Sequence, residues 1–261
     1  MHASTDDHGI ELSLIGIGTG NPEHLTLEAV RALNAVDLIL IPNKGAGKDD
    51  LAGLRQAICA RVIEAPGPRI VEFDLPVRDP AITDYKQRVD HWHDAIAQVW
   101  MACIQAHLGA GQNRVGFLVW GDPSLYDSTM RIAERLKTQS DIRLQVIPGI
   151  TSIQALTAAH AIPVNEIGAP FTITTGRQLR DHGWPDSADT LVIMLDGECS
   201  FQALDPEGVD IWWSAYAGME NQICLSGPLS EISSQIVETR AQARQDHGWI
   251  MDIYLLRKSR D

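Results

Sequence analysis

The chain has 261 residues, of which 44% are hydrophobic and 21% charged, so it can bury the core of one large or two smaller globular domains. Its formal net charge of -13 excludes the broad basic surface on which nucleic-acid binding depends. The sequence contains no uninterrupted apolar run of about 18 residues, the length that spans a bilayer, and its acidic N-terminus does not resemble a secretory signal. We therefore expect a cytoplasmic protein without nucleic-acid or membrane partners.

Apolar runs rich in Val, Ile and Leu alternate with segments of helical periodicity, which is typical of an α/β fold. In the first half of the sequence, strands are predicted at residues 11–17, 37–41, 70–75, 114–120 and 143–147. Helices are predicted between and after them, at residues 51–62, 83–108, 127–137 and 151–160. The helix expected between the first two strands has one face formed by Leu25, Leu27, Val30 and Leu33.

A passage punctuated by Pro and Gly at residues 161–170 marks the predicted domain boundary. Beyond it, the sequence predicts strands at 171–175, 190–195, 211–216 and 223–225, a helix at 231–244 and a last strand at 249–256. We expect an N-terminal domain of residues 1–160 and a C-terminal domain of residues 161–261. Each is predicted to be an α/β sandwich around a central mixed sheet, with a ligand cleft between the two.

The first candidate site is a glycine-rich loop at residues 16–22 (Gly-Ile-Gly-Thr-Gly-Asn-Pro), between a predicted strand and a helix. Its glycines let the backbone approach a ligand closely, although a plain tight turn is the alternative. A dinucleotide fingerprint is disfavoured because Asn21 takes the place of the third glycine. The segment that starts at Pro42 does not match a P-loop. Pro42 stands where the motif needs its first glycine, and Asp49 stands where it needs the Ser or Thr that follows the lysine.

The second candidate is the segment Val-Trp-Gly-Asp-Pro-Ser-Leu-Tyr at residues 119–126, at the carboxyl end of a predicted strand. Ligands of open α/β sheets bind at that edge, and a carboxylate there suits a cationic ligand. Alternatively, Asp122 only caps a type I turn. A third turn, at residues 146–152, repeats this geometry, and its Thr151 is either a site residue or an N-cap.

Taken in order, these three motifs resemble the tetrapyrrole (corrin/porphyrin) methylases. The likeness continues through residues 190–195 and 227–232 to the final strand, and so covers nearly the whole chain. Four passages carry a finer match to a cobalamin-pathway branch of the family: residues 117–129, 174–177, 192–198 and 248–252.

The resemblance implies a homodimeric enzyme that binds S-adenosylmethionine in the inter-domain cleft and needs no metal. The cofactor-binding residues that it implies are Trp120, Gly121, Asp122, Leu125, Tyr126, Thr151, Ser152, Met194, Leu195, Ala217 and Gly218. The residues expected on the substrate side are Gly18, Gly20, Asn21, Pro22 and Arg177. Two departures stand out, because many relatives have Asp at the position of Asn21 and a Met-Gly pair at Leu195-Asp196.

The implied reaction is C-methylation of precorrin-5 at C-1 with release of the acetyl group as acetate. Hydrolysis of the acetyl group needs a base to activate water and a donor to stabilise the oxyanion. The candidates are Tyr126, Asp122, His24 and Glu198, and the sequence does not choose among them. The alternatives are methylation of another ring carbon or of RNA, the latter disfavoured by the charge, and a non-catalytic tetrapyrrole-binding or nicotinamide-binding protein.

The remaining residues of interest have structural explanations beside functional ones. His91 and His93 point to nearly opposite faces of a helix, and the four cysteines form no C-x-x-C pair, so no metal site is predicted. The tryptophans, notably Trp212 and Trp213, are expected to fill a core or an interface, and stacking on a macrocycle is the alternative. Basic residues that could pair with substrate carboxylates, or simply be solvated, are Arg177, Arg180, Lys44 and Lys48.

Overall fold

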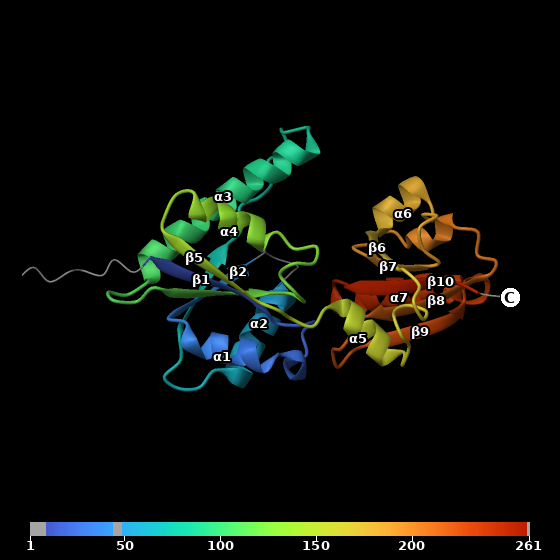
Figure 1. Ribbon diagram of the computed structural model, residues 1–261, viewed down its shortest axis with the longest axis horizontal. Helices are drawn as coiled ribbons and strands as arrows, with labels where there is room; N and C mark the ends of the chain where they lie inside the picture. Colours follow the sequence, from blue (N-terminus) through green and yellow to red (C-terminus); the bar gives the residue numbers. More distant parts are fainter. Residues whose placement is uncertain (1–8, 44–48, 260–261) are drawn as a thin grey trace, which may run out of the picture. The chain divides into compact units, whose positions relative to one another are not determined.

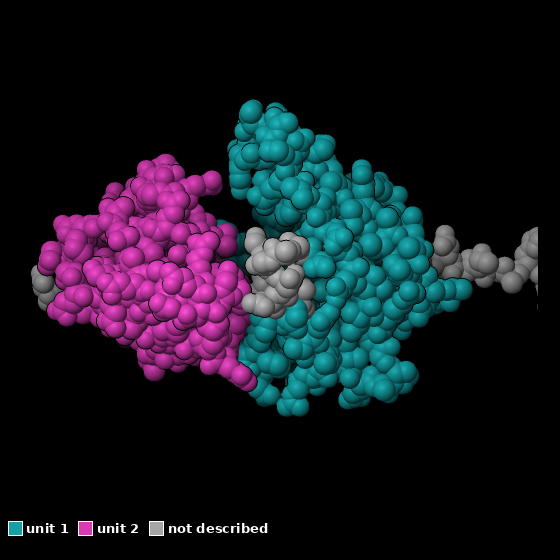
Figure 2. Space-filling view, turned by 180° about the vertical axis from the view of Figure 1, so that it is seen from behind, with its two compact units in different colours: residues 1–150 teal, residues 151–261 magenta. Residues whose placement is uncertain are grey.

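The computed structural model describes residues 9–43 and 49–259, which form two compact units. Residues 1–150 belong to the first unit and residues 151–261 to the second (Figure 2). Lys44 and Lys48 lie outside the described residues. Among the helices that are described, none is both long and apolar enough to cross a membrane.

The first unit is built on a five-stranded sheet. Its strands are β1 (Ile10–Gly16), β2 (Leu38–Asn43), β3 (Arg69–Asp74), β4 (Arg114–Val119) and β5 (Ile142–Ile147). They lie in the order β3-β2-β4-β1-β5, and every neighbouring pair is parallel. The prediction of a mixed sheet is therefore wrong for this unit. A helix follows each of β1 to β4, and such crossovers return the chain to the same starting edge.

Helices cover both faces of this sheet (Figure 1). The helices are α1 (Leu27–Ala35), α2 (Asp49–Val62), α3 (Tyr85–His107) and α4 (Thr129–Lys137). On one face α3 and α4 pack against alternate strand residues such as Leu12 and Phe117. On the other face α1 and α2 pack against residues such as Ile15 and Ile39. This alternation makes the central strands β2, β4 and β1 largely apolar on both sides, as their sequences predict, whereas the edge strands β3 and β5 expose several residues.

One detail of the first predicted helix is wrong. Leu33 is fully buried on α1, but Leu25 precedes the helix and Leu27 is 78% exposed. The reason is the cap: the Thr26 hydroxyl accepts a hydrogen bond from the Ala29 amide, so the helix starts at Leu27, and this residue and Glu28 face solvent while Ala29 is buried.

The second unit contains a mixed five-stranded sheet, as predicted. Its strands are β6 (Thr172–Thr175), β7 (Thr190–Met194), β8 (Val209–Ala215), β9 (Ile223–Pro228) and β10 (Asp252–Lys258), in the order β6-β7-β10-β8-β9. Only β6 and β7 are parallel to each other. Helices α6 (Gly176–His182) and α7 (Leu229–His247) contribute Leu179 and Ile236 to its core, in which Trp213 is fully buried, as predicted. Trp212 points to the other face of β8 and is only half-buried, with the Arg257 guanidinium over its ring.

The units divide between Ile150 and Thr151, ten residues before the predicted boundary. Helix α5 (Ser152–Ala159) contacts β8 and β10 of the second unit. His160, which follows it, lies 3.0 Å through Nε2 from the Ser214 hydroxyl. These contacts are long-range in sequence, whereas Pro and Gly mark only local breaks. Helix α6 was also not predicted, because its seven residues are too few to show helical periodicity.

Candidate active site

Three turns meet at the carboxyl edge of the parallel sheet. A Cβ placed on Gly149, after β5, would lie 2.0 Å from the carbonyl oxygen of Gly121, after β4. A Cβ placed on Gly16, which ends β1, would lie 2.6 Å from the Gly149 amide nitrogen. The three backbones therefore pack directly on one another. The structure brings the three sequence motifs together in one place.

This meeting point has the topology of a ligand site. Strands β1 and β4 are neighbours, yet the chain leaves β1 toward β2 and leaves β4 toward β5, on opposite sides. Loops that diverge in this way open a crevice at the carboxyl edge of an α/β sheet. The glycine-rich loop and the Gly-Asp-Pro turn follow these two strands.

The glycine-rich loop is bonded to the Gly-Asp-Pro turn. The Gly121 amide donates to the Gly18 carbonyl at 2.7 Å, and the two residues form an isolated antiparallel bridge. Gly18 has a φ of 72° and Gly20 one of 109°, conformations that favour glycine. The loop is thus a defined, buried segment of backbone.

The loop leads into a short 3-10 helix, Pro22–His24. Asn21 caps it, because its side-chain oxygen accepts from the Glu23 amide at 2.9 Å. His24 Nδ1 lies 3.3 Å from the Thr19 hydroxyl, so the His24 ring is held against the loop. An amide oxygen suffices for this cap, so the local structure does not require a carboxylate at position 21.

Asp122 is held by hydrogen bonds on both carboxylate oxygens. Oδ1 accepts from the Ser124 amide at 2.8 Å and from its hydroxyl at 2.5 Å, and Oδ2 accepts from the Gly149 amide at 2.9 Å. Burial raises the pKa of Asp122, but these hydrogen bonds outweigh it and leave the pKa below its usual value. The carboxylate is therefore ionised and joins the second turn to the third.

Beyond Asp122, the turn presents Tyr126 to solvent. Tyr126 has a φ of 51° and is 45% exposed, and partial burial raises the pKa of its hydroxyl. A bulky residue with positive φ is strained, and such residues gather at functional sites. Leu125 is half-buried, and its amide donates to the Asp122 carbonyl. Trp120 is half-buried on the other side of the turn.

Sequence reasoning missed Arg55, a residue of α2 that lies beneath this turn. Arg55 is only 5% exposed, its Nε donates to the Leu118 carbonyl at 3.3 Å, and its guanidinium lies 5.1 Å from the centre of the Trp120 ring. Burial lowers the pKa of Arg55 to about 10, and Asp127 partly opposes that shift. Its spacing from the buried Ile58 and Cys59 is the signal that could have placed it on the inner face.

We expect Arg55→Met to lower the free energy of unfolding by about 1–3 kcal/mol, because the Leu118 carbonyl loses a buried donor. Urea denaturation followed by tryptophan fluorescence measures this loss. Arg61→Met is the matched control on the same helix, since the Arg61 side chain is 70% exposed. Equal stability of the two variants would contradict a structural role for Arg55.

In the second unit, Thr151 and Ser152 begin helix α5. The Thr151 hydroxyl accepts from the Ile153 amide, and Gln154 accepts from the Thr151 amide at 3.0 Å, which completes a capping box. Thr151 is thus the N-cap that the sequence left open as an alternative to a site residue. Ser152 is half-buried in the first turn of the helix.

At the end of β7, Leu195 is exposed and strained while Asp196 is buried. Met194 is the last residue of the strand, and Leu195 follows with a φ of 53° and 67% exposure. An exposed apolar side chain in a left-handed conformation suits contact with a ligand. Asp196, by contrast, is 6% exposed. Of the two neighbouring residues, Leu195 is therefore available to a ligand, whereas Asp196 is part of the interior of the unit.

Asp196 organises the passages that carry the finer resemblance. Its carboxylate accepts from the Tyr254 hydroxyl at 2.6 Å and from the Ser200 amide at 2.6 Å, and its backbone carbonyl accepts from Arg240. Arg240 in turn pairs with Asp252 at 2.9 Å. Residues 192–198 and 248–252 are thus joined through Arg240, which donates to the Asp196 backbone carbonyl and pairs with the Asp252 carboxylate. This network was missed because its members are far apart in the sequence.

The turn after β8 contains Ala217 and Gly218. Ala217 is 6% exposed, and Gly218 has a φ of 84° with its amide donating to the Gln222 side chain at 2.6 Å. Tyr216 before them also has a positive φ, of 51°, and is buried. The turn is closely defined by its own hydrogen bonds.

Helix α6 carries the basic residues of the predicted substrate side. Arg177 is exposed in its first turn. Arg180 donates to the Glu198 carboxylate at 2.7 Å, so these two candidates neutralise each other. Glu198 is therefore already engaged, which argues against it as a free acid or base.

Comparisons with known proteins agree with this geometry. The model of the family described as Tetrapyrrole (Corrin/Porphyrin) Methylases matches residues 11–233. The chain is 49% identical over 253 residues to the precorrin-6A synthase (deacetylating) of a Sinorhizobium species, covering 96% of both chains. It is 33% identical over 160 residues to the precorrin-2 C(20)-methyltransferase of a Sinorhizobium species, covering 58% of this chain and 59% of the other.

Solved structures show the same fold. A cobalamin synthesis related protein from Corynebacterium diphtheriae matches with a TM-score of 0.82 at 39% identity, covering 96% of this chain and 100% of the other. A uroporphyrin-III C-methyltransferase from Thermus thermophilus, solved with S-adenosyl homocysteine, matches with a TM-score of 0.57 at 20% identity, covering 94% and 96%. The chain therefore belongs to the tetrapyrrole (corrin/porphyrin) methylase family.

Proposed function

We propose that this protein is an S-adenosylmethionine-dependent C-methyltransferase of cobalamin biosynthesis, which methylates precorrin-5 at C-1, releases its acetyl group as acetate and yields precorrin-6A. The observation that carries this proposal is the 49% identity, across 96% of both chains, to a precorrin-6A synthase (deacetylating). The three turns that pack together at the switch point of the parallel sheet support it, because they are the passages on which the family resemblance rests.

The residues of the Gly-Asp-Pro turn fit a cationic cofactor. The lowered pKa keeps Asp122 ionised, and S-adenosylmethionine carries a positive sulfonium, so the turn offers it a favourable charge. Tyr126 and Leu195 each present an exposed, strained side chain, and we propose that they contact the cofactor from their own units. When bound, the cofactor supplies the methyl group.

The deacetylation half of the reaction falls to the protein's own side chains. Water adds to the acetyl carbonyl while a base takes the water proton. The bond between C-1 and the acetyl carbon then breaks, acetate leaves, and the electron pair of that bond stays on C-1. Asp122 and Glu198 are already engaged in hydrogen bonds or an ion pair. We therefore favour His24, held by Thr19, as the base and Tyr126 as the oxyanion donor.

The decisive experiment incubates the protein with precorrin-5 and labelled S-adenosylmethionine and measures both methylated product and free acetate. The proposal expects the two in equal amounts. Methyl transfer without acetate would instead support a methylase that acts at another ring carbon. Calorimetry with S-adenosylhomocysteine separates both from a non-catalytic binding protein, because absence of saturable binding would exclude any methylase.

Further expectations follow from the family resemblance. We propose a cytoplasmic homodimer that needs no metal and binds neither nucleic acid nor membrane. Light scattering of the purified protein tests the dimer, and dialysis against a chelator before the assay tests the metal requirement.

We expect Asp122→Ala and Tyr126→Ala to weaken binding of S-adenosylhomocysteine by at least about tenfold while the fold stays intact. The first loses the hydrogen bond that its carboxylate accepts from the Gly149 amide and so loosens the turn, and a hydrogen bond to a charged group contributes about 1.5–3 kcal/mol. Calorimetry measures the affinity and circular dichroism the fold. Asp205→Ala, at an exposed turn, is the control. Unchanged affinity in both variants would mean that the turn is only structural.

A further inference from the structure

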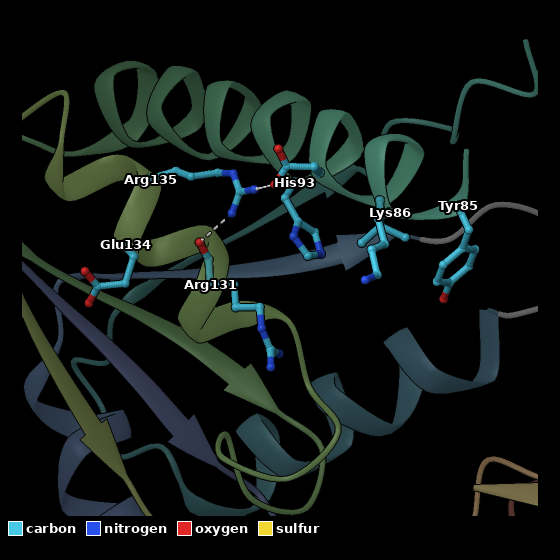
Figure 3. A pocket seen from close by; sticks show the side chains of 8 residues that line it. Tyr85, Lys86, His93, Arg131, Glu134 and Arg135 are labelled. Atoms are coloured by element: carbon cyan, nitrogen blue, oxygen red, sulfur yellow. Dashed lines mark hydrogen bonds and ion pairs between the residues drawn. The ribbon is translucent and has the colours of Figure 1, made fainter. Parts of the chain in front are cut away.

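A pocket of about 460 Å³ lies between α3 and α4 of the first unit, apart from the glycine turns (Figure 3). Its lining residues are Tyr85, Lys86, Val89, Asp90 and His93 from α3, and Arg131, Glu134 and Arg135 from α4. None of the residues proposed above for cofactor binding or catalysis lines it. The pocket therefore needs an explanation of its own.

Most charges around the pocket neutralise each other. Arg135 pairs with Asp90 and Asp94, and Glu134 pairs with Lys137 at 3.0 Å. These ion pairs account for the acidic lining residues and for one of the basic ones.

Two cations remain. Lys86 forms no hydrogen bond or ion pair within the described part of the chain, and Arg131 donates only to the backbone carbonyl of Asp127. The chain has 34 acidic residues for 21 Lys and Arg, so a basic side chain has many carboxylates available. Two cations without a carboxylate partner, one on each helix that lines the pocket, are thus unexpected for this sequence, and they give the pocket an excess of positive charge.

His93 is a second, independent sign of a ligand. Its side chain is only 4% exposed, yet its buried Nε2 has no hydrogen-bond partner within residues 9–43 and 49–259. A buried polar atom without a partner costs free energy, which a ligand that accepts its hydrogen bond would recover. Figure 3 shows the His93 ring and Lys86 extending from α3, and Arg131 extending from α4, into the same space.

The pocket lies at the N-terminal ends of α3 and α4, and these helices follow strands that end at the edge of the sheet where the three turns meet. Because β3 and β4 are parallel neighbours of β2, they end at the same edge, and α3 and α4 begin after them. Lys86 is the second residue of α3 and Arg131 the third of α4. Arg131 also follows Tyr126 by only five positions. A large ligand at the turns could therefore extend one of its groups toward this pocket.

We propose that Lys86, His93 and Arg131 form a subsite that binds one peripheral carboxylate of the tetrapyrrole substrate and so fixes the orientation of the macrocycle. The proposal rests on the function proposed above, which supplies a substrate with several carboxylate side chains. The Arg131 guanidinium can bind a carboxylate through two parallel N–H groups, Lys86 adds a compact charge, and His93 in its Nε2–H tautomer donates to the same anion.

The test measures substrate binding separately from turnover. Precorrin-5 is titrated without cofactor, and its dissociation constant is followed by quenching of tryptophan fluorescence. We expect Lys86→Gln and Arg131→Gln each to weaken this binding about tenfold, and Arg131→Lys to recover part of the loss because it keeps the charge. Binding of S-adenosylhomocysteine should be unchanged. Both side chains are exposed, so the variants are expected to fold.

Arg143→Gln, on β5, is the matched control, since it removes the same charge from a side chain that is 83% exposed. Wild-type affinity for precorrin-5 in both Arg131→Gln and Lys86→Gln, or an equal loss in Arg143→Gln, would overturn the subsite. A parallel loss of S-adenosylhomocysteine binding would also overturn it. If the wild-type protein binds precorrin-5 through these residues but forms no product, the proposed function fails while the subsite stands.

Discussion

Replacing Gly149 with alanine should reduce the affinity for S-adenosylhomocysteine and the rate of methyl transfer by about 100-fold or more. The added Cβ would lie 2.0 Å from the Gly121 carbonyl oxygen and 2.9 Å from the Gly16 backbone. Neither neighbour is a flexible side chain, so the turns must move apart. Their movement would break the 2.9 Å hydrogen bond from the Gly149 amide to Asp122 and displace the whole candidate site.

Calorimetry and the labelled-methyl assay measure this effect. The control is Gly53→Ala, because a Cβ at Gly53 of α2 meets nothing within 4 Å, and alanine there should stabilise the helix by about 0.5–1 kcal/mol. If Gly149→Ala bound the cofactor product as tightly as Gly53→Ala, the close contact of the turns would have no part in binding.

The largest effect on stability is expected from Asp196→Ala, which should lower the free energy of unfolding by at least about 3 kcal/mol. Removing the carboxylate leaves the buried Tyr254 hydroxyl and the Ser200 amide without their acceptor. It also leaves a space beside Gly176, because the Asp196 side chain packs so closely there that a Cβ on Gly176 of the wild type would lie 2.3 Å from its carboxyl carbon. Urea denaturation measures the loss, and the exposed Asp205→Ala should lose far less.

The pH dependence of this effect has a definite sign. Burial raises the pKa of Asp196, but hydrogen bonds from Tyr254, Glu198 and Ser200 outweigh burial and leave the pKa lowered. The resulting stabilisation is complete above the pKa of an unfolded Asp, about 3.9, and is lost as the pH falls through the lower value of the folded state. The advantage of wild type over Asp196→Ala should therefore shrink on acidification. A constant difference between pH 7 and pH 2 would contradict the assignment.

Much of the fold could be predicted because its signals are local. Long apolar runs and helical periodicity predicted every strand of the parallel sheet and the long helix α3, within a few residues. The short helix α6 and the first turn of α1 could not be predicted in this way, since seven residues show no period and a single cap decides where a helix begins. Strand direction was also beyond reach, because pairing depends on crossovers that join residues far apart in the chain.

The candidate site divides in the same manner. The sequence by itself showed, through the order of its glycine motifs, a resemblance to the family, and it located the turns, because turns that bring backbone close to a ligand need glycine whatever surrounds them. Only the tertiary structure showed which contacts these residues make. Asp122 became a link between two turns, Thr151 an N-cap, and Glu198 a partner of Arg180. The tertiary structure also brought together Arg55 and Trp120, Asp196 and Tyr254, and the cations of the α3–α4 pocket, because each of these contacts joins side chains that only packing places side by side.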